Sequence, residues 1–221
     1  PTESIGSLNE FMMQPAELTQ LAVASLKGIP EGTTVYNPFA GMNSYAVAAP
    51  QYHFVGEEIN QQTWAAGQVR LMVHGVDADI QLGDSNTAHQ GDMFKAIITT
   101  PPFGLRGDLE QWERIYDMLE DGGRLVMIAP PNLTFNRHYA RLIERWRKDM
   151  SLAAIVQLPT RMFPHTAVAA LLVVVEKNDH HTIRMIDASS MGTYTKGRSL
   201  TLGADNVAML SRLLQDKDVQ S

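Results

Sequence analysis

The stretch Phe94-Lys95-Ala96-Ile97-Ile98-Thr99-Thr100-Pro101-Pro102-Phe103-Gly104 decides the fold of this chain. Its apolar, β-branched run stops at a double proline, which predicts a buried strand followed by a stiff, extended turn. The turn holds a backbone carbonyl and an aromatic ring at the end of a strand. In open α/β sheets, ligands bind in the crevice outside the carboxyl ends of the strands. Alone, such a turn is more typical of a simple strand end, so its meaning depends on the segments around it.

Strand and helix patterns alternate on both sides of this stretch. We expect helices over 17–26, 45–49, 61–73, 109–119, 138–147 and 206–214, and strands over 33–36, 52–55, 79–82, 95–99, 124–129, 152–158 and 168–176. A strand and a helix that recur about every twenty residues predict right-handed βαβ units. The fold class is therefore α/β, with a mostly parallel, doubly wound sheet and helices on both faces.

The composition is that of one large globular domain. The chain has 221 residues, of which 44% are hydrophobic and 19% are charged, and this is enough for a proper core. We expect a single domain over 1–221, with a leading helix in 15–28, a sheet core over 33–187 and a tail over 188–221 that ends in a helix.

The charge of the chain limits how it could hold a polynucleotide. A net charge of −6 and a pI near 5.6 oppose binding through the overall field, so a local basic patch or a partner subunit has to supply positive charge. The basic concentration at 137–148 is most simply a solvated helix face, and contact with a phosphate backbone is the alternative.

Three features that the sequence lacks exclude further kinds of site and protein. The chain has no cysteine, which excludes disulfides and thiolate metal sites. Its seven histidines show no metal-ligand spacing, so we expect no metal. Residues 1–9 lack an apolar signal core and the longest apolar run, 167–175, is too short to cross a bilayer, so we expect a cytoplasmic protein without a membrane segment.

Each of the first four predicted strands ends in residues that suit a nucleoside-like ligand. After the first, the turn Asn37-Pro38-Phe39-Ala40-Gly41 lets a ligand approach the backbone closely, because glycine has no side chain, and a helix N-terminus follows. Glu58, seventeen residues after Gly41, has the spacing of a carboxylate that accepts both hydroxyls of a ribose. Asp84 is placed to accept from the exocyclic amine of a base. The joint order of these strand ends predicts a ligand site.

A family resemblance rests on these segments in their order. The chain resembles the S-adenosylmethionine-dependent DNA adenine-N6 methyltransferases, and most closely the methylation (M) subunit of type I restriction-modification systems. The segments that carry this resemblance are 35–41, 56–60 followed by His74-Gly75-Val76, 83–85 and 100–104. Phe11-Met12-Met13-Gln14-Pro15 and the segments 121–130 and 155–164 match further stretches of that family. The resemblance covers about residues 8 to 187.

The resemblance implies a Rossmann-like methyltransferase fold, S-adenosylmethionine as cofactor and a flipped DNA adenine as substrate. The cofactor-binding residues it implies are Gln14, Asn37, Pro38, Phe39, Gly41, Asn43, Glu58, Asp84 and Ser85. The catalytic residues it implies are Thr100, Pro101, Pro102 and Phe103, with the target base held by Phe103 and Phe163. Residue 100 and the Pro101 carbonyl then accept the amine hydrogens, which prepares the nitrogen for in-line attack on the sulfonium methyl. No metal is needed, and a specificity subunit or a further DNA-binding domain is implied as the partner that grips DNA.

The chain departs from the family pattern at four positions. Thr100 replaces the usual Asn or Asp, Asn37 the usual Asp, Asn43 the usual last glycine of the cofactor loop, and Gln14 the usual threonine. Thr100 matters most, because its hydroxyl is one atom shorter. Loss of one positioned hydrogen-bonding group at a reacting centre costs about 2.7–4 kcal/mol, or ~100–1000-fold in rate.

Three functions therefore remain open. The first is a DNA adenine-N6 methyltransferase domain, and the second is a degenerate, non-catalytic binding or assembly module of the same fold. The third, an amine methyltransferase acting on rRNA or protein, shares the Pro-Pro-aromatic turn but fits the flanking sequence less well. Restoring asparagine at Thr100 is expected to raise turnover in the first case and to leave the second unchanged.

Overall fold

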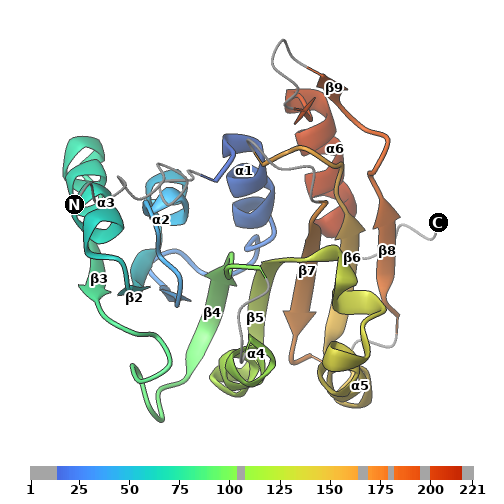
Figure 1. Cartoon of the computed structure of the whole chain (residues 1–221), viewed down its shortest axis with the longest axis horizontal. Coiled ribbons are helices and arrows are strands. Elements are labelled where there is room, and N and C mark those ends of the chain that lie inside the picture. The colour runs from blue at the N-terminus through green and yellow to red at the C-terminus, as the bar shows by residue number, and fades with distance from the viewer. Residues whose placement is uncertain (1–13, 104–107, 164–168, 179–181, 195–199, 216–221) are drawn as a thin grey trace, which may run out of the picture.

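The structure is a computed structural model that describes residues 14–103, 108–163, 169–178, 182–194 and 200–215 (Figure 1). Its main sheet has eight strands, β1 (Thr34–Asn37), β2 (His53–Glu58), β3 (Ala78–Leu82), β4 (Phe94–Thr99), β5 (Leu119–Ala129), β6 (Leu152–Gln157), β7 (Leu171–Glu176) and β8 (Arg184–Asp187). The α-helices are α1 (Ala16–Ala24), α2 (Ser44–Ala48), α3 (Gln61–His74), α4 (Asp108–Asp117), α5 (Ala140–Lys148) and α6 (Ala204–Gln215). Two 3-10 turns, η2 (Pro131–Thr134) and η3 (Arg137–Tyr139), precede α5, and β9 (Thr193–Tyr194) pairs antiparallel with β10 (Leu200–Thr201) in a separate small sheet.

The strand order of the main sheet is β3-β2-β1-β4-β5-β7-β6-β8. All neighbouring pairs are parallel except those of β7, which runs antiparallel between β5 and β6. The predicted mostly parallel α/β sheet is confirmed. As a result, every strand except β7 points its carboxyl end to the same side of the sheet, which we call the carboxyl edge.

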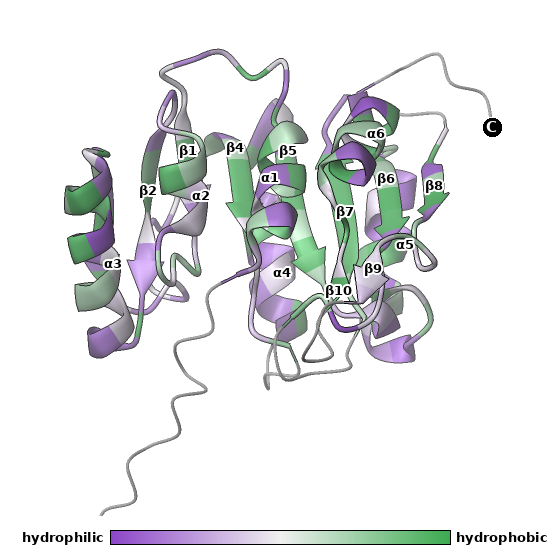
Figure 2. Cartoon of the chain, turned by 90° about the horizontal axis from the view of Figure 1, so that it is seen from above, coloured by the Kyte–Doolittle hydropathy of each residue, from purple (hydrophilic) through white to green (hydrophobic). Residues whose placement is uncertain are grey.

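Helices cover both faces of the sheet (Figure 1). One face carries α1, α2, α3 and α6, and the other carries α4 and α5. The first core contains Leu18, Leu21, Phe54 and Leu210, and the second contains Trp112, Tyr116 and Trp146. Strands β4, β5 and β7 are predominantly hydrophobic (Figure 2), as expected for strands that are buried on both faces.

Local sequence explains where α3 begins and ends. The side chain of Asn60 accepts hydrogen bonds from the backbone N–H groups of Gln62 and Thr63, both at 3.0 Å, and so caps the first turn. Gly75 ends the helix in the left-handed conformation that favours glycine, with φ +63°. The predicted helix over 61–73 is therefore correct to within one residue.

The region after α4 differs from the prediction. The helix expected over 109–119 ends at Asp117, and β5 begins at Leu119 rather than at Arg124. Phe94 pairs with Leu119 and Ala96 with Arg124, so the segment between Leu119 and Arg124 bulges out of the ladder. Gly122 and Gly123 are part of this bulge.

The predicted tail is part of the helical layer. The Glu17 carboxylate in the first turn of α1 accepts from the backbone N–H groups of Leu202 and Gly203, at 2.7 and 2.8 Å. At the other end of the pair, Gln215 donates to the Ala24 carbonyl at 3.0 Å. Helix α6 is thus fixed along α1 at both ends and completes the cover of β7 and β6.

Candidate active site

The ends of β1, β2 and β3 lie side by side at the carboxyl edge. Asn37 pairs with Gly56 at the end of β1, and Glu58 pairs with Leu82 at the end of β2. β4 lies on the other side of β1, where Tyr36 pairs with Ile97. The four turns that the sequence assigns to a ligand site therefore leave the sheet next to one another.

Glu58 joins the turns that follow β1 and β2. One carboxylate oxygen accepts from the Gly41 N–H at 2.9 Å, and the other accepts from the Asn60 N–H at 2.8 Å. Each oxygen keeps a second lone pair for a further donor. A carboxylate fixed in this way is ready to accept the two hydroxyls of a ribose.

The glycine turn leaves room for a ligand above its backbone. Gly41 has φ +54°, and a Cβ atom at this position would meet no other atom within 4 Å. The side chain of Asn37 is buried and, in the amide orientation that satisfies its nitrogen, donates to the carbonyls of Ile98 and Phe39. Asn37 therefore supports the turn from its buried side, and the backbone of Gly41 beside Glu58 stays open to a ligand.

Helix α3 holds the glycine turn from below. Arg70 donates to the Met42 carbonyl and to the Ser44 hydroxyl, both at 2.9 Å. Asn43 is buried with φ 58°, and its amide has no hydrogen-bond partner within the described residues. Gly67 lies directly under it, so the Asn43 side chain and the Gly41 carbonyl can approach α3 closely where the helix has no side chain of its own.

Replacing Gly67 with alanine is expected to weaken cofactor binding more than folding. The new Cβ would lie 2.8 Å from the Asn43 amide nitrogen and 3.0 Å from the Gly41 carbonyl oxygen, so the turn has to move. Alanine also gains about 1 kcal/mol of helix propensity over glycine, which offsets part of the strain. Calorimetric titration with S-adenosylmethionine and a melting curve of the same variant separate the two effects. Unchanged affinity would show that the turn does not hold the ligand.

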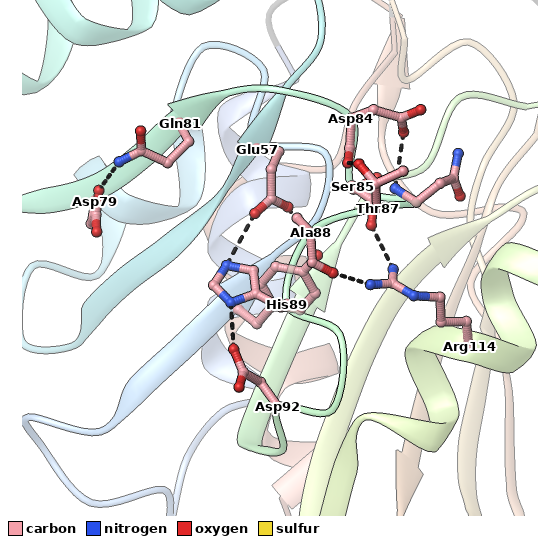
Figure 3. A network of polar contacts seen from close by, with 12 residues as sticks. Glu57, Asp79, Gln81, Asp84, Ser85, Thr87, Ala88, His89, Asp92 and Arg114 are labelled. Atoms are coloured by element: carbon pink, nitrogen blue, oxygen red, sulfur yellow. Dashed lines mark hydrogen bonds and ion pairs between the residues drawn. The ribbon is translucent and has the colours of Figure 1, made fainter.

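The turn after β3 is fixed by α4. The Asp84 side chain is exposed and accepts from the Asn86 N–H at 2.9 Å, whereas Ser85 is buried. Arg114 of α4 donates to the Ser85 carbonyl at 2.5 Å and to the Ala88 carbonyl (Figure 3). The structure therefore places Asp84 at the carboxyl edge with its second carboxylate oxygen free of hydrogen bonds within the described residues.

Thr100 and Gln14, two of the four departures from the family pattern, contact each other. The Thr100 hydroxyl donates to the Gln14 side-chain oxygen at 2.6 Å, and the Tyr45 hydroxyl lies 2.6 Å from the same Thr100 oxygen. The Gln14 amide nitrogen in turn donates to Thr19 at 3.1 Å. These positions, far apart in sequence, form one hydrogen-bonded group at the end of β4.

The direction of these hydrogen bonds leaves the Thr100 hydroxyl oxygen able to accept a further hydrogen bond. Its only proton goes to Gln14, so the Tyr45 hydroxyl must be the donor in the other bond. Burial raises the pKa of Tyr45 to about 12, so the phenol keeps its proton at neutral pH. Thr100 therefore retains one lone pair for a third donor, such as the amine of a bound base.

The two residues expected to hold the target base also meet. The rings of Phe103 and Phe163 lie 6.1 Å apart, centroid to centroid, at an interplanar angle of 81°. This edge-to-face contact is not a parallel pair, so a base has to separate the rings before it can stack between them. Pro101 is buried and Pro102 is exposed between this pair and Thr100.

A polar network lies on the opposite face of β2 from Glu58 (Figure 3). The buried Glu57 carboxylate accepts from the Tyr36 hydroxyl at 2.9 Å and lies 3.0 Å from His89, whose other ring nitrogen is 2.8 Å from Asp92. The His89 ring also contacts Tyr36 and Phe94 edge to face. The helix-free connection 83–93 is held on the sheet by these contacts.

The environment of Glu57 predicts how the stability of the chain depends on pH. Burial raises its pKa above the ordinary 4.5, so the folded state holds this proton more tightly than the unfolded chain does. The free energy of unfolding is then expected to fall as pH rises from 4.5 through the raised pKa, and the fall should be absent in Glu57→Gln. Urea unfolding of both proteins across this range measures the difference. Parallel pH profiles of the two proteins would contradict the assignment.

Sequence reasoning missed several residues of this region. Tyr45, Glu57 and His89 gave no signal, because their partners are distant in sequence. Arg70 and Gly67 also escaped notice, although a glycine inside a predicted helix often marks a close approach of backbone. Residues 104–107 and 164–168, next to the candidate base-binding residues, lie outside the described residues.

The described residues contain neither a metal-binding cluster nor a membrane-spanning helix. No group of three or more His, Asp or Glu side chains comes together there in a way that could hold a metal ion. No helix in this part of the chain is long and apolar enough to cross a membrane.

Solved structures of known proteins share this fold. The type I restriction-modification methyltransferase subunit from Streptococcus thermophilus superposes with a TM-score of 0.81 at 16% identity, over 94% of this chain and 54% of that one. The M protein of the type I restriction enzyme EcoKI gives 0.74 at 21% identity, over 93% and 54%. A Listeria monocytogenes protein described as a class I S-adenosylmethionine-dependent methyltransferase gives 0.75 at 13% identity, over 95% and 73%. This chain thus spans about half the length of the two restriction-modification subunits.

Sequence comparison gives the family. A comparison with curated proteins produced no match. The model of the N-6 DNA Methylase family matches residues 10–114 and 108–220, which together take in nearly the whole chain. The match includes all four strand ends at the carboxyl edge. The chain belongs to the N-6 DNA methylase family.

Proposed function

We propose that this chain is the catalytic domain of a DNA adenine-N6 methyltransferase that uses S-adenosylmethionine. The observation that carries the proposal is the Thr100 hydroxyl, held as an acceptor at the end of β4 on the same edge as the Glu58 carboxylate. The family match and the shared fold support it.

The residues of the chain have distinct tasks in this proposal. Glu58 accepts the ribose hydroxyls, the Gly41 turn lies against the nucleoside, and Asp84 accepts from the amine of the cofactor base. S-adenosylmethionine supplies an electrophilic methyl group on a sulfonium sulfur. Thr100 and the Pro101 carbonyl each accept one hydrogen of the target amine. These two bonds draw the nitrogen lone pair out of the ring conjugation that otherwise makes it a poor nucleophile.

Methyl transfer in a single turnover tests the proposal. The chain is mixed with S-adenosylmethionine labelled in the methyl group and with duplex DNA, and digested product is analysed for N6-methyladenine. A matched duplex whose adenines are already N6-methylated is the control for substrate, and an rRNA fragment tests the third candidate. Label in N6-methyladenine supports the proposal. Cofactor binding without transfer to any substrate would favour the non-catalytic module.

A partner for DNA binding is part of the proposal. The solved relatives with type I restriction-modification descriptions are about twice as long as this chain, and one of them was studied for complex assembly. With a net charge of −6, this chain lacks the overall field to grip DNA firmly. We infer that a specificity subunit or a further DNA-binding domain supplies most of the affinity.

A further inference from the structure

The basic helix α5 is neutralised by its neighbour α4. Arg141 forms an ion pair with Glu113, and Arg145 forms one with Asp117, both at 2.5 Å. Lys148 pairs with Glu144 within α5 at 3.5 Å. Most of the cations in 137–148, the segment considered for phosphate contact, are thus paired with carboxylates. This helix is therefore a poor surface for DNA.

Four other arginines keep an unpaired guanidinium group within the described part of the chain. They are Arg137, Arg147, Arg161 and Arg212. Arg147 and Arg212 lie in the last turns of α5 and α6, away from the carboxyl edge. The end of α5 leads into the start of β6, and the Leu213 carbonyl next to Arg212 accepts from Arg184 at the start of β8. The other two belong to loops at the carboxyl edge.

Arg137 and Arg161 follow the carboxyl ends of β5 and β6, respectively. β5 is the parallel neighbour of β4, and Thr99 pairs with Met127, so the Pro130-Pro131 turn leaves the sheet beside the Pro101-Pro102 turn. Arg161 is two residues before Phe163, whose ring contacts Phe103. Both free guanidinium groups are therefore carried by loops that border the candidate base site.

The loop after β5 also presents an aromatic ring on a rigid support. Phe135 is 76% exposed, yet the residues around it are fixed. Leu133 is buried, and the Asn136 side chain caps the next turn through the His138 N–H at 3.0 Å. The buried Asp108 carboxylate then accepts from the Tyr139 hydroxyl at 2.6 Å. The exposed Phe135 ring is thus carried by a loop whose neighbouring residues are fixed by packing and hydrogen bonds.

Resting on the proposed function, we propose that these two loops, 130–139 and 158–163, are the surface that meets duplex DNA beside the flipped adenine. Arg137 and Arg161 bind backbone phosphates, and the Phe135 ring packs against the nucleotides next to the target. Two features point to DNA as the partner: the positive charge of the two loops and their position beside the candidate base site. In an acidic chain, DNA is expected where free cations stand next to the base site, because unpaired carboxylates elsewhere repel phosphates.

The salt dependence of DNA binding tests the two arginines. Each phosphate contact contributes about −0.9 to the slope of log affinity against log salt concentration. Arg137→Ala and Arg161→Ala should each reduce the steepness by about 1 for a nonspecific duplex, and the double variant by about 2. Arg147→Ala and Arg212→Ala are matched controls that remove an equally unpaired arginine at the opposite edge, and their slopes should equal that of the unchanged chain.

Phe135 has a matched control of its own. Val73 on α3 is also 76% exposed, far from the carboxyl edge. Phe135→Ala should weaken DNA binding several-fold, up to ~10-fold, without changing the salt slope, whereas Val73→Ala should leave binding unchanged.

The outcomes separate this surface from the proposed function. If the unchanged chain methylates DNA but the control arginines reduce the slope as much as Arg137 and Arg161 do, the surface is wrong and the function stands. If the chain binds S-adenosylmethionine but no duplex DNA at low salt, the surface is wrong, and the single-turnover assay of methyl transfer decides the proposed function separately. Cofactor affinity of each variant, measured by calorimetry, should stay unchanged, because none of these side chains lies at the Glu58 turn.

Discussion

The double variant Gln14→Thr/Thr100→Asn should methylate DNA faster than the natural chain, by up to ~100–1000-fold. Both changes restore residues that are usual in the family. The asparagine reaches one atom further than the threonine hydroxyl and so comes closer to the amine of the target base. We expect the larger part of the gain only when both positions change together.

The reason is the crowding around residue 100. The Thr100 oxygen is already 2.6 Å from both Gln14 and Tyr45, so a longer side chain at this position has no free space in their direction. In the single variant Thr100→Asn, the new amide has to form its hydrogen bond with Gln14, so the gain in methylation rate should be small. Shortening Gln14 to threonine removes one of these two neighbours. This refines the expectation from sequence, in which the single change at Thr100 was sufficient.

Single-turnover rates of the natural chain, the two single variants and the double variant form a complete cycle. A coupling between the two positions appears as a double-variant rate that exceeds the product of the single effects. Independent effects would contradict the interaction seen in the structure. Rates at zero for all four proteins, with cofactor binding intact, would favour the non-catalytic module.

Glu58→Gln should weaken S-adenosylmethionine binding by ~100-fold or more. The ribose loses one acceptor outright and keeps the other only as a neutral amide oxygen, whereas a hydrogen bond to a charged acceptor is worth about 1.5–3 kcal/mol. The new amide nitrogen also has to face the N–H of either Gly41 or Asn60, since both carboxylate oxygens accept from these groups. The glycine turn and the ribose acceptor are therefore disturbed by the same change.

Glu57→Gln is the matched control for this measurement. Glu57 and Glu58 are consecutive in β2, so their side chains point to opposite faces of the sheet. The control should bind the cofactor as the natural chain does and should change only the pH dependence of stability. Calorimetric titration of both variants decides the matter. Equal affinities for the two variants would remove Glu58 from the cofactor site.

The sequence predicted the repeating part of the fold well. Buried strands such as β4 and β6 carry apolar runs with clear ends, and α3 carries its own cap residues, so local signals were sufficient. β8 was missed because its exposure alternates over only four residues, and its parallel pairing with β6 is a long-range contact. The start of β5 was missed because a bulge hides the pairing of Leu119 with Phe94.

The same distinction applies to the candidate site. The strand ends were predicted because turn residues and their spacing can be read along the chain. What each residue contacts could not be predicted. The bond between Thr100 and Gln14 spans 86 positions, and the ion pair of Arg141 with Glu113 joins two separate helices. The first links two unusual residues into one hydrogen-bonded unit, and the second is one of the ion pairs that offset the positive charge of α5.

The place of β7 in the sheet has a consequence for synthesis on the ribosome. β6 has no neighbour on its inner side until β7 is made, because β7 lies between β5 and β6 and comes later in the chain than both. Translation from Gln157 to Glu176 takes roughly 1–4 s at ~5–20 residues per second. During that interval the edges of β5 and β6 that later pair with β7 have no hydrogen-bonded neighbour. Slowing translation over 158–176 should therefore increase aggregation of the nascent chain more than slowing it after β8.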